Sequence, residues 1–152
     1  MNTECKFLGV DPDEEESGKL YKTILKGVFV KGSVGAKAGI YKTDVLVRGS
    51  TNLYKHETLL HYSFQDFLAR YYKHDIIDYL FIDIEGDEYA LMKDLIQNPE
   101  KYPTICQINV EYHSPFENDR GLEFFADFKK SLKSGPFFPL NVDAFKSAFF
   151  NR

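Results

Sequence analysis

The sequence predicts an α/β fold in a single domain, and three observations support this. Strand-like and helix-like segments alternate along the chain, which is typical of α/β architecture. Residues 76–86 are almost continuously apolar, as expected of a strand buried on both faces of a parallel sheet. A chain of 152 residues with 43% hydrophobic residues can bury one good core and is too short for two, so residues 1–152 are expected to form one domain.

The first half of the chain is predicted to begin with a strand and a helix. Residues 6–10 form a short apolar strand, and residues 11–25 turn and continue as a helix. Asp13 and Glu16 have the spacing of a capping box at the start of this helix. Residues 27–49 hold two β-rich arms around small residues, which predicts a strand followed by a hairpin.

The second half alternates predicted helices with predicted strands. Apolar residues recur at helical spacing in residues 63–75, in the segment between residue 86 and Asn98, and in residues 121–134. The buried strands are expected at residues 76–86 and 104–113. Residues 137–142 and 145–150 are expected to close the chain as an antiparallel strand pair.

Charge and composition restrict the partners and the compartment. The formal charge of −4, with no basic cluster longer than a pair, argues against binding nucleic acid or an anionic membrane. No apolar run approaches the roughly 18 residues of a membrane span, and the first ten residues lack the features of a signal peptide. Cys5 and Cys106 lie in apolar segments and are too few for a disulfide framework. We therefore expect a soluble, cytoplasmic protein.

Four polar residues follow the two predicted core strands. Asp83 and Glu85 are two residues apart and therefore share one face, and Glu111 and His113 repeat this spacing. Ligands of open α/β sheets bind beyond the carboxyl ends of the strands, where these residues lie. If the two strands are neighbours, the four side chains converge. The cluster could then hold a general base, a divalent cation or a polar substrate.

Structural roles must be weighed against these functional ones. Asp87 is most simply an N-cap, and Glu88 in the first helical turn favours the helix dipole without any chemistry. A lone His113 at a strand end is more often a surface histidine. Asp83 lies between two isoleucines of a core strand and needs partners there, which favours a function.

Two other segments lack the spacing of the motifs they resemble. His56 and His61 are five residues apart, whereas a zinc-protease helix places its two histidines four apart. Residues 32–39 contain three glycines without the G-x-G-x-x-G spacing of a dinucleotide-binding loop. We expect neither motif, since a hairpin turn explains the glycines.

The segment IIDYLFIDIEGDEYALMKDLI, residues 76–96, resembles the most characteristic segment of the FkbM-type methyltransferases, in which a strand ending in D-x-E-G-x-E leads into a helix. Residues 6–13 are similar to the second strand of that family, residues 30–39 to its third strand and hairpin, and residues 104–113 to its fifth strand. The resemblance implies a Rossmann-like methyltransferase sheet, S-adenosylmethionine as the cofactor, and O-methylation of a small molecule or a glycan.

The resemblance also implies roles for individual residues. Asp11 matches the acidic residue that accepts hydrogen bonds from the cofactor ribose, and Ser33 and Val34 match positions beside the adenine. Asp83 and Glu85 match the acidic strand end that faces the methyl group and the acceptor. No metal ligand is implied.

Methyl transfer by direct displacement needs a positioned acceptor oxygen and a base for its proton. Glu85, Glu111 or His113 could be that base, and the sequence does not choose between them. Two other functions remain open: a non-catalytic binding or scaffold protein that retains the fold, and a metal-dependent hydrolase that uses these three residues and Asp83.

The resemblance implies one element that the chain lacks. Methyltransferases of this type begin with a strand and a glycine-rich loop, and only residues 1–5 precede the segment similar to the second strand. We therefore expect an N-terminally incomplete, truncated domain that could be inactive. The missing strand would leave open edges on the strands at residues 6–10 and 76–86, and such edges promote self-association.

Overall fold

A computed structural model describes residues 5–47, 50, 53–116 and 119–143 of the chain. It confirms a mixed α/β fold. The strands are β1 (Leu8–Asp11), β2 (Val28–Lys31), β3 (Ser33–Gly35), β4 (Gly39–Leu46), β5 (Tyr54–Ser63), β6 (Ile76–Ile82) and β7 (Thr104–Val110). The helices are α1 (Lys19–Thr23), α2 (Phe64–Tyr71), α3 (Glu88–Gln97) and α4 (Asp119–Ser131), with a π-helical segment η1 (Glu14–Gly18) and a 3-10 turn η2 (Pro99–Lys101).

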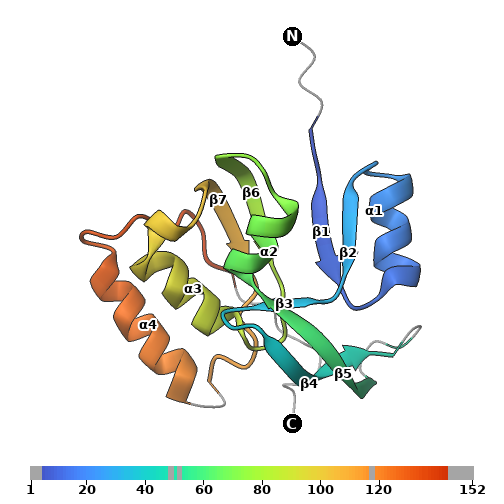
Figure 1. Ribbon diagram of the computed structural model, residues 1–152. Coiled ribbons are helices and arrows are strands. Elements are labelled where there is room, and N and C mark those ends of the chain that lie inside the picture. Colours follow the sequence, from blue (N-terminus) through green and yellow to red (C-terminus); the bar gives the residue numbers. More distant parts are fainter. Residues whose placement is uncertain (1–4, 48–49, 51–52, 117–118, 144–152) are drawn as a thin grey trace.

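These strands form three small sheets (Figure 1). β1 pairs in parallel with β2, and β6 pairs in parallel with β7. The third sheet has the order β3-β5-β4, in which β5 is parallel to β3 and antiparallel to β4. β6 and β7 are neighbours, which is the condition on which the expected convergence of the four polar residues depended, and Ile82 lies opposite Val110 at their carboxyl ends.

The hairpin differs from the prediction. Its arms are β4 and β5, so residues 27–49 supply only one of them. β5 was not predicted, because its sequence YKHETLLHYS mixes charged residues with apolar ones and only its alternating burial marks it as a strand. His56 and His61 lie in this strand, which confirms that they do not form a zinc-protease helix.

The prediction of a C-terminal antiparallel strand pair is wrong for the one arm that the structure describes. Residues 137–142 form no strand. Pro139 within this arm has no backbone N–H to donate to a neighbouring strand, which disfavours pairing. The second arm, residues 145–150, lies outside the described residues.

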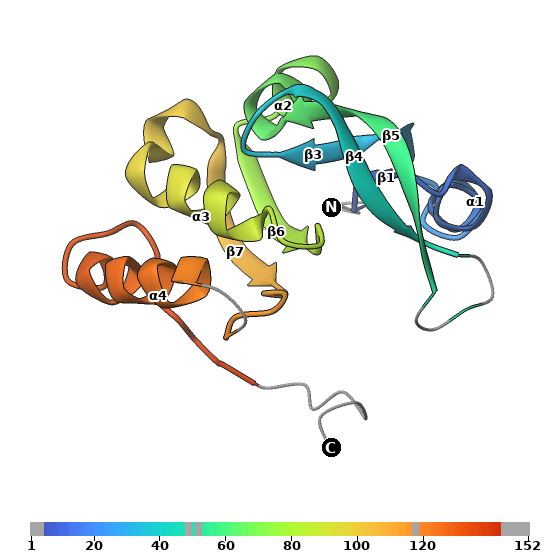
Figure 2. The ribbon, with the colours of Figure 1, turned by 90° about the horizontal axis from the view of Figure 1, so that it is seen from below.

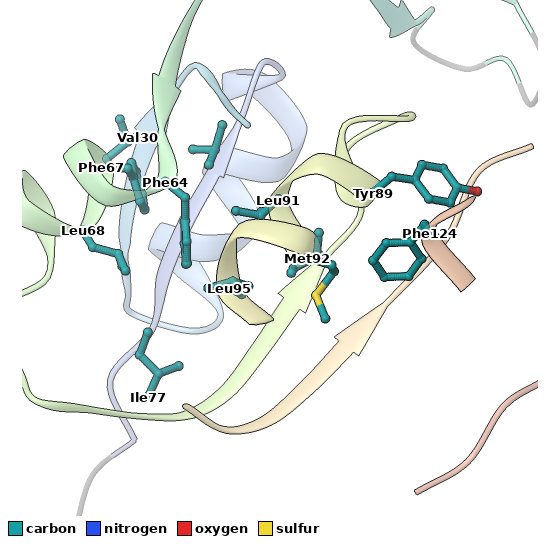
Figure 3. Packing of buried hydrophobic residues seen from close by; sticks show 12 residues of the cluster. Val30, Phe64, Phe67, Leu68, Ile77, Tyr89, Leu91, Met92, Leu95 and Phe124 are labelled. Atoms are coloured by element: carbon teal, nitrogen blue, oxygen red, sulfur yellow. The ribbon is translucent and has the colours of Figure 1, made fainter. Parts of the chain in front are cut away.

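The core forms around α3. Leu91, Met92 and Leu95 are buried, and Figure 3 shows Leu91 and Leu95 on the side of α3 that faces Phe64 of α2. Burying a side chain of this size contributes about 1.5–3 kcal/mol. These contacts fix α3, and with it the loop that leads from β6 into the helix.

A second set of contacts holds the first turn of α3, where that loop enters the helix. α4 lies on the same side of β6 and β7 as α3 (Figure 2). The ring of Tyr89 in α3 packs edge-on against Phe124 of α4, with 5.8 Å between the ring centroids. The Tyr89 hydroxyl also donates a hydrogen bond of 2.7 Å to the carbonyl of His113. The first turn of α3 is therefore attached to the segment that follows β7.

The opposite face of β6 is not covered by the described residues. Tyr79 and Phe81 are 63% and 75% exposed, so the prediction that this strand is buried on both faces is wrong. β6 pairs only with β7, and β1 pairs only with β2, among the residues that the structure describes. None of the helices among the described residues has the length and apolar character of a membrane span.

Candidate functional site

The predicted polar residues converge where β6 and β7 end. Asp83 follows β6, Glu111 follows β7, and the Glu111 N–H donates to the Ile82 carbonyl at 3.0 Å, which holds the two ends together. Nε2 of His113 lies 3.5 Å from Oδ1 of Asp83 and 3.6 Å from Oε2 of Glu85. The same nitrogen lies 4.0 Å from Oε1 of Glu111. The predicted convergence of these four side chains is therefore confirmed.

Asp83 reaches this cluster from a different environment than expected. The sequence suggested a carboxylate within the core strand, but the side chain of Asp83 is 66% exposed. β6 ends at Ile82, so Asp83 already belongs to the loop. Its carboxylate is accessible to a ligand.

Glu88 determines how His113 is oriented. Glu88 is 0% exposed, and its Oε1 accepts a hydrogen bond of 2.6 Å from the backbone N–H of His113. The same Oε1 lies 3.2 Å from Nδ1 of the His113 ring. Oε2 accepts from the N–H of Gly86 at 2.7 Å. Because Nδ1 faces a carboxylate, we infer that the ring proton resides on Nδ1 and that Nε2 offers its lone pair to the cluster.

Sequence reasoning missed this role of Glu88, to which it gave only an interaction with the helix dipole. A signal was present, because Glu88 is the last residue of the D-x-E-G-x-E pattern. The two-residue spacing between Gly86 and Glu88 in this pattern allows the Gly86 N–H to donate to the Glu88 carboxylate.

The backbone bends sharply on both sides of the cluster. Glu85 has φ 53° and Ser114 has φ 48°, both in the left-handed region, and Gly86 follows with φ 112°. This conformation costs a residue other than glycine about 1–2 kcal/mol. At Glu85 the bend coincides with a carboxylate 3.6 Å from Nε2 of His113, so the strained residue is also one that contributes to the cluster.

The electrostatic environment favours proton uptake by Glu85. The side chain of Glu85 is 44% exposed, and its partial desolvation raises the pKa of Glu85 above its ordinary value, although the nearby His113 opposes this rise. The negative charges of Asp83, Glu88 and Glu111 raise the pKa further. A carboxylate with a raised pKa is a stronger base than one in water.

Asp87 occupies the N-cap position of α3, as predicted, but its side chain makes no capping hydrogen bond. Its Oδ2 accepts instead from the N–H of Ala36, at 2.8 Å. A Cβ added to Gly35 would lie 2.0 Å from the same oxygen. Asp87 therefore connects the end of β3 to the loop that carries the cluster, and this contact requires a glycine at position 35.

The three predicted cofactor-binding residues lie on β1 and β3. Asp11 ends β1, is half-buried, and accepts a hydrogen bond of 2.7 Å from the N–H of Asp13. Burial is the main cause that raises the pKa of Asp11, and the charge of Asp83 contributes to it. Ser33 is half-buried at the start of β3, and Val34 is only 6% exposed. Their contact with a cofactor stays a prediction.

Comparison with known protein families identifies one match. A family model described as the methyltransferase FkbM domain matches residues 2–137 of the chain. Comparison of the chain with curated proteins and with solved structures found no match.

Proposed function

This chain belongs to the methyltransferase FkbM family, and we propose that it transfers a methyl group from S-adenosylmethionine to a hydroxyl oxygen of a small molecule or a glycan. The observation that carries the proposal is the convergence of Asp83, Glu85 and Glu111 on His113 at the ends of two adjacent parallel strands. This is the edge of an open α/β sheet at which ligands bind.

The cofactor side of the proposed site rests on Asp11. A half-buried carboxylate at the end of a parallel strand is suited to accept the two hydroxyl hydrogens of a ribose. Oδ1 of Asp11 already accepts from the Asp13 N–H, which fixes the carboxylate plane. The residues present therefore fit the ribose of S-adenosylmethionine, which supplies an electrophilic methyl group when bound.

We further propose that the two parallel pairs belong to one Rossmann-like sheet. The parallel pairing of β1 with β2 and of β6 with β7 supports this arrangement. So does the position of β1, which lies on the side of β2 that faces β6 in Figure 1. A further strand between β1 and β6 would join the pairs and bring Asp11 and the cluster to the same edge.

On the acceptor side, the chain must orient a hydroxyl group and remove its proton. Direct displacement requires the acceptor oxygen in line with the bond that breaks, so positioning supplies much of the rate. Glu85 and Glu111 lie 3.6 and 4.0 Å from Nε2 of His113, so a hydroxyl group bound beside this nitrogen has a base within reach. A positioned base of this kind contributes about 10²–10⁴-fold to a rate.

Calorimetry tests the cofactor side. We expect S-adenosylmethionine to bind the wild-type chain and Asp11→Ala to weaken binding by about 1–3 kcal/mol, because the ribose hydroxyls lose a charged acceptor. Asp127→Ala is a matched control, since Asp127 is exposed on α4 and paired with Lys130. Equal affinities of the wild type and Asp11→Ala would refute the assignment of Asp11.

A further inference from the structure

The cluster carries more negative charge than the described residues compensate. Asp83, Glu85 and Glu111 each approach Nε2 of His113 within 3.5–4.0 Å. Among the residues whose side chains the structure describes, no lysine or arginine forms an ion pair with these three carboxylates. Glu88 adds a fourth carboxylate behind the ring. Like charges at such distances repel one another, and a cation among them would remove the repulsion.

The orientation of His113 is that of a metal ligand. Metal-binding histidines commonly donate the N–H of one ring nitrogen to a carboxylate, which directs the other nitrogen to the metal. Here Nδ1 lies 3.2 Å from the fully buried Glu88, and Nε2 faces the exposed carboxylates. The 3.5 Å from Nε2 to Oδ1 of Asp83 is too long for a good N–H···O hydrogen bond. With the ring proton on Nδ1, Nε2 carries no proton and its lone pair faces the carboxylates.

We propose that Nε2 of His113 and one carboxylate oxygen each from Asp83 and Glu85 bind a divalent transition-metal cation. The three ligand atoms all lie within 4.8 Å of one another. Ligand bonds to such ions are about 2.0–2.2 Å long, so neighbouring ligands of one ion lie roughly 3–4 Å apart. The separations of 3.5 and 3.6 Å from Nε2 fall in this range. One imidazole with two carboxylates favours Mn²⁺ or Zn²⁺ over Mg²⁺.

Cation binding does not depend on the proposed methyl transfer, but it would define how the acceptor is held. Three protein ligands leave coordination positions open, and an acceptor hydroxyl that binds there would lose its proton more readily. Glu111 lies outside the proposed ligand set and would be the carboxylate that accepts this proton. Glu88 would be a positioning residue, since it contacts His113 and not the ion.

Titration with Mn²⁺, followed by electron paramagnetic resonance, tests the site on the protein alone. The signal of free Mn²⁺ should decrease until one ion is bound per chain, and Zn²⁺ should displace it. We expect His113→Ala and Glu85→Gln to weaken binding at least tenfold, and Glu88→Gln to weaken it by roughly tenfold to a hundredfold. His74→Ala and Glu100→Gln are matched controls, because both residues are exposed and lie outside the cluster.

The possible outcomes separate this proposal from the proposed function. Stoichiometric binding that the cluster variants lose and the controls keep would support the site, whether or not the chain transfers methyl groups. Absence of Mn²⁺ and Zn²⁺ binding at millimolar concentration, or equal binding by the cluster variants and the controls, would overturn it. If Glu88→Gln fails to fold, Glu85→Gln decides, since Glu85 is exposed in the loop after β6.

Discussion

Replacing Glu88 by glutamine should destabilise the chain by about 2–4 kcal/mol, because a hydrogen bond to a charged group contributes about 1.5–3 kcal/mol and a stranded buried donor costs about 1–3 kcal/mol. The two carboxylate oxygens of Glu88 accept from the N–H groups of Gly86 and His113, and the side chain is 0% exposed. Glutamine has one acceptor oxygen and one NH₂ group. One of the two backbone N–H groups would therefore face another donor.

Urea unfolding measures this change, with Glu100→Gln as the control for the same substitution at an exposed site. Nitrogen NMR of the His113 ring gives a second measurement. We expect the wild type to carry its ring proton on Nδ1 and the Glu88→Gln variant to lose that preference. An unfolding free energy equal to that of the wild type, with an unchanged ring, would refute the role of Glu88.

Three further predictions concern β1, β3 and β6. Burial raises the pKa of Asp11 in the folded state above its value in the unfolded chain. The protonated carboxyl group therefore stabilises the fold at a pH below the unfolded-state pKa, and this stability is lost as the pH rises through the folded-state pKa. Asp11→Asn should therefore gain unfolding free energy over the wild type at pH 7 and not at pH 3 in urea titrations, and an equal difference at both would disprove the cause. Gly35→Ala should destabilise the chain by about 1–3 kcal/mol, because its methyl group would lie 2.0 Å from Oδ2 of Asp87; unchanged urea unfolding would count against this contact. Phe81 is 75% exposed on the open side of β6, so Phe81→Ser should reduce self-association in size-exclusion chromatography, and identical elution of both proteins would argue against this surface.

The parts of the fold that the sequence predicted are those with strong local patterns. The apolar residues of β6 and β7 predicted these strands, and the four polar residues that follow them do converge. Strand alternation does not explain that convergence, because β6 ends at Ile82 and β7 ends at Val110, before the polar residues begin. The helix after residue 86 was expected to end before Asn98, and α3 does end at Gln97. Local chemistry was sufficient for these strands and this helix end.

The parts that were missed depend on contacts between distant residues. Glu88 meets His113 only because α3 packs its first turn against the end of β7, 25 residues along the chain. Asp87 bonds Ala36, which is 51 residues away, instead of capping its own helix. β5 carries too many polar residues for its pattern to predict a strand, and β4 supplies the pairing that defines it. Such tertiary contacts override local preferences.

Methyl transfer from radiolabelled S-adenosylmethionine to a mixture of hydroxyl-bearing small molecules and glycans tests the central claim most directly. The account predicts label in an ether-linked methyl group of one acceptor class. It also predicts that transfer falls at least tenfold in Asp11→Ala and in His113→Ala but not in Asp127→Ala, because only the first two lie at the proposed site. Label that appears at the same rate with all four proteins, or a wild-type chain that binds the cofactor and never transfers its methyl group, would contradict it.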